Sequence, residues 1–258
     1  MSRLAAPLLI ALLGAPAAAD MRDVRNCVEE NMPRLSIVQE LTLRVREESG
    51  EETFTARFKL YWRRLSGDER RILLRFAAPD DLKGAAVLVE SKPGGRRQVF
   101  LYLPELGKPR RVMSRGQLDT FLGQANLGIE ELELLLDPVR SKRKKLLPRS
   151  QEVEGRRTWI LEERTAGEAD SRYDRTLIFI DREYCIPVRA ELFGADGSTK
   201  KVLTVDVATV TREVESWVPR SLIFHDLERN SDTILQVDDI DVDSEFSPAL
   251  LTVEALAR

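Results

Sequence analysis

A chain of 258 residues with 40 Lys and Arg against 43 Asp and Glu has a formal net charge of −3 at pH 7. This mixture of charges excludes a general nucleic-acid-binding protein, which would gather basic residues on one surface. The chain also has one histidine and two cysteines. One imidazole and two thiols are too few metal-ligating side chains for a typical zinc or iron site. We therefore expect no metal and no cofactor.

The first residues show the features of a secretory signal peptide in the usual order. Arg3 precedes an apolar run that is too short to cross a bilayer, and three alanines end at Ala19 before a polar residue. We therefore expect residues 1–19 to be removed. Residues 20–258 are then expected to fold as one domain in an oxidising compartment outside the cytosol.

Cys27 and Cys185 both lie in the mature part of the chain. In a secreted protein an even number of cysteines favours disulfide bonds, and two cysteines allow one intramolecular pairing. Two free thiols are the alternative. We predict the bond, which would tie the first helix to the sheet.

The mature chain opens with an amphipathic helix and continues mainly as strands. Apolar residues from Met21 to Met32 recur at three- and four-residue spacings, and Pro33 ends the pattern. Apolar and polar residues then alternate, most clearly over residues 54–63, where Arg57 and Lys59 separate large apolar side chains. One face of this strand should be apolar and the other cationic and solvated. The full set of predicted strands is 41–45, 54–63, 71–76, 85–91, 97–103, 158–163, 175–180, 184–193, 200–210, 217–224 and 233–240.

Two further stretches are helical in pattern. Residues 119–137 are apolar on more than one side, and Ser247 with Pro248 resembles the start of a helix near the end of the chain. Short strands with few intervening helices predict a mainly β (α+β) fold built on one strongly curved antiparallel sheet. A few helices would cover its apolar face. Either packed side chains fill the space beneath them, or a cavity is left for an apolar ligand.

The sequence has little catalytic chemistry. Common nucleotide-binding, zinc-protease and serine-hydrolase motifs are absent, and His225 is the only imidazole. We therefore predict a protein that is not an enzyme, with His225 in a structural or surface role rather than a catalytic one.

A cationic run includes Arg140, Lys142, Arg143, Lys144 and Lys145. It fits a solvated loop or a strand edge, where lysines discourage aggregation. Contact with anionic lipid headgroups is the alternative.

Several segments together resemble the outer-membrane lipoprotein-sorting protein family, a LolA-like group. In chain order they are CVEENMPRLS (27–36), PDDLKG (79–84), YLPELGKPRR (102–111), FLGQANLGIEEL (121–132), YCIPVRAELF (184–193) with Gly197 and Lys200, WVPR (217–220) and the segment around Phe246. The chain departs from the family at Gln124, Ala125 and Asn126 and at Gly128 and Ile129, where relatives carry a hydroxyl residue, Asp and a tyrosine segment.

The resemblance implies a half-open β-barrel covered by helices, whose apolar interior holds acyl chains. It implies a soluble periplasmic carrier that moves a lipid or acylated lipoprotein between the inner and outer membranes, with an inner-membrane transporter as donor and an outer-membrane protein as acceptor. Apart from the resemblance, we expect a monomer. Two alternatives remain open: a periplasmic scaffold or assembly protein with a filled core, and a hydrolase that uses His225.

The predicted lipid-binding residues follow from strand alternation and from the helical cover. They are Phe54, Phe58, Leu60, Trp62, Ile72, Leu74, Phe76, Leu101, Leu103, Phe121, Leu122 and Leu132.

Overall fold

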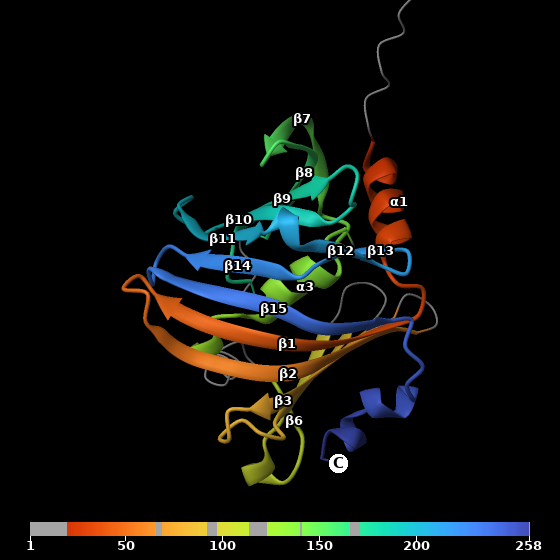
Figure 1. Cartoon of the computed structure of the whole chain (residues 1–258), viewed down its shortest axis with the longest axis vertical. Helices are drawn as coiled ribbons and strands as arrows, with labels where there is room; N and C mark the ends of the chain where they lie inside the picture. Colours follow the sequence, from red (N-terminus) through yellow and green to blue (C-terminus); the bar gives the residue numbers. More distant parts are fainter. Residues whose placement is uncertain are drawn as a thin grey trace, which may run out of the picture.

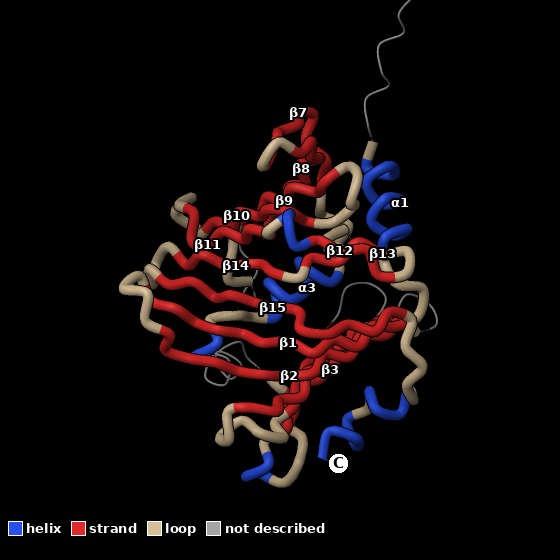
Figure 2. Tube along the Cα trace, in the orientation of Figure 1, coloured by secondary structure: helices blue, strands red, loops and turns tan. Residues whose placement is uncertain are grey.

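The computed structural model describes residues 20–65, 69–91, 97–113, 123–139, 141–165 and 171–257. Within these residues, thirteen strands form one curved sheet in the order β6-β5-β4-β3-β2-β1-β15-β14-β11-β10-β9-β8-β7 (Figure 1). Figure 2 shows the same arrangement by secondary structure. The sheet is antiparallel and not closed, which confirms the predicted mainly β, half-open architecture. The predicted signal peptide lies outside the described residues.

The elements follow in chain order. They are α1 (Met21–Asn31), β1 (Ser36–Glu47), β2 (Glu52–Arg64), β3 (Arg70–Ala78), β4 (Ala86–Ser91), β5 (Arg97–Tyr102), η2 (Pro104–Leu106), β6 (Arg110–Arg111), η3 (Gly123–Ala125), α3 (Ile129–Leu136), β7 (Lys145–Val153), β8 (Arg156–Arg164), β9 (Arg175–Asp181), β10 (Pro187–Phe193), β11 (Thr199–Val205), η4 (Val207–Thr209), β12 (Val210–Glu213), β13 (Ser216–Pro219), β14 (Ser221–Asp226), β15 (Ser231–Val242), η5 (Pro248–Leu251) and η6 (Val253–Ala257).

The predicted alternation of apolar and polar residues along β2 matches the side chains that the structure buries and exposes. Phe58 is paired with Leu41 of β1 and Phe76 of β3, and all three side chains are buried. Arg57 is exposed on the opposite face. A charged guanidinium would lose its hydration in the core, so the register with Phe58 inside is strongly preferred.

The convex face differs from the solvated surface expected for it. Leu73 of β3 and Leu88 of β4 are completely buried there, because η5 and η6 at the end of the chain pack over them. Arg71 donates a hydrogen bond to the carbonyl of Leu251 at 2.7 Å, so an outward arginine also anchors this cover. The solvated face predicted for the strand at residues 54–63 therefore does not extend over β3 and β4, because the C-terminal segment supplies an apolar partner there.

Helix α1 is capped at its start, packs its apolar side against the core and is joined by a disulfide to the segment before β10. Its N-cap Asp20 and N3 residue Asp23 form a reciprocal capping box, and Val24 and Val28 are buried. Cys27 is joined to Cys185 by a disulfide with a Cα–Cα distance of 5.3 Å. The predicted bond is therefore confirmed.

Some predicted boundaries are wrong because turns interrupt the apolar alternation. The stretch 200–210 ends as β11 at Val205, where Asp206 caps η4 with its side chain. The stretch 217–224 divides into β13 and β14 around Arg220. The cationic run leads into an edge strand, β7, that contains Pro148 and was not predicted as a strand.

Replacing both cysteines by serine should lower the free energy of unfolding by about 2–5 kcal/mol, the range for loss of native disulfides. The bond closes a segment of 158 residues, which restricts the unfolded chain. Guanidinium denaturation of the double variant and of reduced wild-type protein should give the same midpoint. A midpoint equal to that of oxidised wild-type protein would contradict the stabilising role.

Candidate functional site

The concave face of the sheet carries an apolar surface beneath helix α3. Leu41 of β1, Leu60 of β2 and Leu235 of β15 are each less than 5% exposed. Helix α3 places Leu132 over this surface, and Leu132 is also buried. The helix therefore covers the sheet much as the apolar pattern of residues 119–137 predicted, although it is shorter than that pattern.

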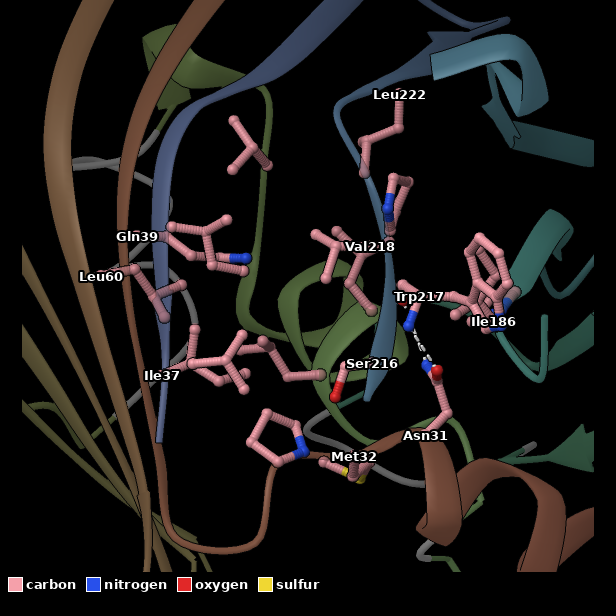
Figure 3. A pocket seen from close by; sticks show the side chains of 18 of the residues that line it. Asn31, Met32, Ile37, Gln39, Leu60, Ile186, Ser216, Trp217, Val218 and Leu222 are labelled. Atoms are coloured by element: carbon pink, nitrogen blue, oxygen red, sulfur yellow. Dashed lines mark hydrogen bonds between the residues drawn. The ribbon is translucent and has the colours of Figure 1, made fainter. Parts of the chain in front are cut away.

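A cavity of about 130 Å³ remains between the concave face, α3, the end of α1 and the β12–β13 hairpin (Figure 3). We call it the apolar cavity, because carbon atoms supply most of its wall. Its main lining residues are Met32, Ile37, Leu41, Phe58, Leu60, Leu132, Leu135, Leu136, Ile186, Trp217, Val218, Leu222, Leu235, Val237 and Ile240.

One wall of the apolar cavity is built by the hairpin and α1 together. The Asn31 side chain donates a hydrogen bond to the Trp217 carbonyl at 3.1 Å and accepts one from the Trp217 amide at 2.6 Å (Figure 3). The Trp217 ring lies 4.6 Å from the Tyr184 ring, centroid to centroid. Cys185 also lines the cavity. This wall is therefore held by paired hydrogen bonds, ring contacts and a covalent bond.

The turn that carries Cys185 is organised by Asp181. Its carboxylate accepts hydrogen bonds from the amides of Glu183 at 2.8 Å and Tyr184 at 2.7 Å, and it pairs with Arg156. Burial would raise the pKa of Asp181, but the bonds from Arg156 and the two amides outweigh burial and hold its pKa below the ordinary value. The carboxylate is thus ionised at neutral pH and keeps the turn ordered.

A second cavity, of about 500 Å³, lies on another side of α3. We call it the charged cavity. Trp62 and Ile72 from β2 and β3 meet Ile178 and Leu192 from β9 and β10 around it, so the two wings of the sheet face each other here. Leu136 lines both cavities.

Ionised side chains surround the apolar part of the charged cavity. They are Arg70, Arg97, Glu130, Glu133, Asp137, Lys142, Arg143, Lys144 and Glu163. Arg70 pairs with Asp137 in a contact that is about 10% exposed on each side, and Arg97 pairs with Glu133. These pairs connect the C-terminal part of α3 to strands β3 and β5.

The N-terminal part of α3 is anchored by a buried ion pair. The ammonium group of Lys201, on β11, lies 3.0 Å from Glu131 of α3, and their side chains are 3% and 0% exposed. Lys201 also donates to the Asn126 carbonyl at 2.8 Å, and the Tyr173 hydroxyl donates to Glu131 at 2.6 Å. Two buried charges are tolerated because each is neutralised and hydrogen-bonded.

Tyr173 and Gly128 also take part in this anchor. Burial raises the pKa of Tyr173 well above its ordinary value, and the Glu131 carboxylate raises it further, so the phenol stays neutral and donates its proton. Glu131 also accepts a bond from the Gly128 amide at 3.0 Å. A Cβ at Gly128 would stand 2.7 Å from the Glu131 carboxylate, so glycine allows this cap.

The predicted lipid-binding residues fall into five groups. Phe58, Leu60 and Leu132 line the apolar cavity, and Trp62 and Ile72 line the charged cavity. Leu74 and Phe76 are buried in the main core, and Phe54, Leu101 and Leu103 pack partly buried against it. Phe121 and Leu122 lie outside the described residues.

Sequence reasoning missed the anchor formed by Lys201, Glu131, Asn126 and Tyr173. One signal was present: alternation in β11 puts Lys201 on the same face as the buried Leu203. An inward lysine requires an acidic partner. Asn126, which replaces the family residue, adopts a left-handed conformation with φ 47° and contributes its carbonyl to the anchor.

His225 lies on β14 with its side chain 40% exposed, and Nδ1 is 2.7 Å from the Asp232 carboxylate. Within the described part of the chain, no hydroxyl or thiol forms a hydrogen bond with this ring. The described residues also contain no group of three or more His, Cys, Asp or Glu that could hold a metal ion. None of the described helices is long and apolar enough to cross a membrane.

A family model with the description "-like: Uncharacterized protein" matches residues 68–258, most of the chain. The chain belongs to this family. A search of curated proteins finds no significant match.

Solved structures share the fold of this family member. A domain assigned as an outer membrane lipoprotein-sorting protein from Vibrio parahaemolyticus has a TM-score of 0.79 at 18% identity, over 93% of this chain and 98% of that one. A DUF1329 family protein from Desulfovibrio piger gives 0.79 at 19% identity, over 92% and 97%. A LolA superfamily protein from Nitrosomonas europaea gives 0.65 at 16% identity, over 91% and 98%. The resemblance seen in the sequence is confirmed at the level of the fold.

Lys201→Ala should lower the free energy of unfolding by about 3–5 kcal/mol, because it leaves the Glu131 carboxylate buried without its counter-charge. Denaturant unfolding measures the loss. Lys200→Ala is the matched control: its ammonium group pairs with Asp196 and Glu228 on the surface, so the midpoint should barely move. Equal losses from the two variants would contradict the role of the anchor.

Proposed function

We propose that this protein is a periplasmic carrier that binds the acyl chains of a lipid or lipoprotein between α3 and the concave face of the sheet. The observation that carries the proposal is the apolar cavity beneath α3. Burial of an acyl chain contributes about 0.8 kcal/mol per methylene group removed from water, so no catalytic group is needed.

The size of the apolar cavity implies that the cover moves when cargo enters. Its volume of about 130 Å³ is below the roughly 300–1,000 Å³ of typical ligand sites. A complete acyl chain therefore requires α3 to shift away from the sheet. The anchor at Lys201 and the pair between Arg70 and Asp137 hold α3 by polar contacts, which water can replace when the helix opens.

The cellular setting is part of the same proposal. The leader at residues 1–19 directs the chain across the inner membrane, and residues 20–258 work as one domain and as a monomer. A transporter in the inner membrane would supply the cargo and an outer-membrane acceptor would receive it. The Cys27–Cys185 bond suits this oxidising compartment.

Phe58→Asp should abolish binding of a fluorescent fatty acid, whereas Arg57→Asp should leave binding unchanged. Phe58 lines the apolar cavity and Arg57 is exposed on the opposite face of β2. An ionised carboxylate at position 58 would have to lose its hydration against the acyl chain. Fluorescence titration measures both affinities, and equal losses would contradict the proposed binding face.

A second variant separates loss of binding from loss of folding. Val218→Phe adds apolar volume to the cavity wall without burying a charge. If the cavity is empty space, the larger side chain should be accommodated with little change in thermal stability. Acyl affinity should fall, because the added ring occupies the position of the chain.

A scaffold with a filled core is the first alternative. Native mass spectrometry of gently purified protein distinguishes the two. Co-purified lipid, released when α3 is loosened by Lys201→Ala, supports a carrier. A protein that binds neither co-purified lipid nor an added fatty acid supports a scaffold.

A hydrolase that uses His225 is the second alternative, and the geometry of the ring argues against it. The imidazole is hydrogen-bonded to Asp232 on the face of β14 opposite Phe224, whose side chain lies in the main core. His225→Ala should therefore leave acyl binding unchanged. Loss of an ester-hydrolysis rate in this variant, with the fold intact by circular dichroism, would favour the enzyme.

A further inference from the structure

We propose that Gln39 and Ser216 make the apolar cavity selective for cargo whose acyl chain is joined through a secondary amide. The two side chains would replace the hydrogen bonds that the amide loses when it leaves water. This inference rests on the proposed carrier function, and it adds a choice between cargo molecules that apolar contacts alone cannot make.

Gln39 is a polar residue at an inward position of β1. Ile37 and Leu41, on either side of it along the concave face, are 8% and 3% exposed, and strand alternation places Gln39 on the same face. The partners of Gln39 in the neighbouring strands are Leu60 of β2 and Ile240 of β15, which also line the apolar cavity. The Gln39 amide is therefore held among apolar side chains.

Ser216 lines the same cavity from the β12–β13 hairpin. It is 5% exposed, and Gln39 is partly buried. Figure 3 shows the two side chains directed into the cavity from opposite walls. Within the part of the chain that the structure describes, neither side chain forms a hydrogen bond. Buried polar groups normally have a hydrogen-bond partner, so both groups are available to a molecule inside the cavity.

The lining of the apolar cavity favours a neutral ligand group over an ion. None of the described residues that line this cavity has a charged side chain. An ion inside it would lose its hydration without gaining a counter-charge. Gln39 and Ser216 each offer a donor and an acceptor. A neutral group that also donates and accepts hydrogen bonds is therefore the best match.

A secondary amide matches two polar side chains on opposite walls. In its trans form the carbonyl and the N–H point to opposite sides of the chain. One wall can therefore donate to the carbonyl while the other accepts from the N–H. An ester has a carbonyl but no N–H, so it leaves an acceptor in the wall without a partner. A site built to hydrogen-bond such a group discriminates against an analogue that lacks it.

The two polar side chains belong to parts of the molecule that do not depend on α3. Strand β1 pairs with β2 on one side and β15 on the other. The hairpin is joined to α1 by the two hydrogen bonds between Asn31 and Trp217. The separation of Gln39 and Ser216 is therefore set by the sheet and α1. A cargo amide would meet the same two groups before and after the cover closes.

The test compares N-butyloctanamide with butyl octanoate, which have the same chain length and differ by an N–H in place of an oxygen. Each is used to displace the fluorescent fatty acid from the wild-type protein. We expect about tenfold tighter binding of the amide, the effect of one well-placed hydrogen bond. In Gln39→Leu/Ser216→Ala the ester should bind at least as tightly as the amide, because an amide loses more hydration in an apolar cavity.

Gln151→Leu is the matched control, since Gln151 is an exposed glutamine of β7 outside the cavity lining. This variant should keep the preference for the amide. Gln39→Leu alone should unfold at the same temperature as wild type or at a higher one, because it removes an amide that forms no hydrogen bond within the described residues. A lower unfolding temperature would assign Gln39 a structural role and would overturn the inference.

Equal affinity of wild type for the amide and the ester would also overturn the inference. So would a preference that persists in Gln39→Leu/Ser216→Ala or one that is lost in Gln151→Leu. Tighter binding of butyl 3-hydroxyoctanoate than of the amide would assign the two side chains to a hydroxyl group on the acyl chain and would overturn it as well. These outcomes leave the carrier function intact. Failure of the fluorescent fatty acid itself to bind would instead contradict the carrier function, and the inference with it.

Discussion

The structure depends on covering the apolar concave face of a sheet that does not close. Thirteen strands curve far enough for β2 and β3 to face β9 and β10, but β6 and β7 remain separate edges. A closed barrel would bury its interior by itself, whereas this sheet needs another element to exclude water. Helix α3 has that position. The exclusion of water from the interior therefore depends on how firmly α3 is held.

The polar contacts of α3 specify its position more than they add stability. A buried pair such as Lys201 and Glu131 loses much of its attraction to the cost of dehydration, so its net contribution is small when it is intact and large when one partner is lost. Apolar residues at the same sites would hold the helix without defining one position of the helix on the sheet. The hydrogen bonds from Lys201 to Asn126 and from Tyr173 to Glu131 define that position.

The sequence predicted those features that follow from local periodicity. Arg57 and Lys59 favour one orientation for β2, and two cysteines allow only one intramolecular disulfide. Contacts between distant segments were not predictable in this way: Leu73 looks like an exposed residue of a half-solvated strand until the C-terminal segment packs on it. The sequence showed the cationic run that includes residues 142–144, but not that it shares a cavity with distant residues. Trp62 of β2 and the cations of this run line the same cavity only because the sheet is curved.

The two sides of the apolar cavity are held by different chemistry, and this determines which side can open. The α1 side has a disulfide at Cys27 and paired hydrogen bonds between Asn31 and Trp217, so its displacement would require breaking a covalent bond. The α3 side has ion pairs and hydrogen bonds, whose groups can be solvated by water. In the proposed carrier, entry of cargo is therefore expected on the α3 side, where the charged cavity also lies.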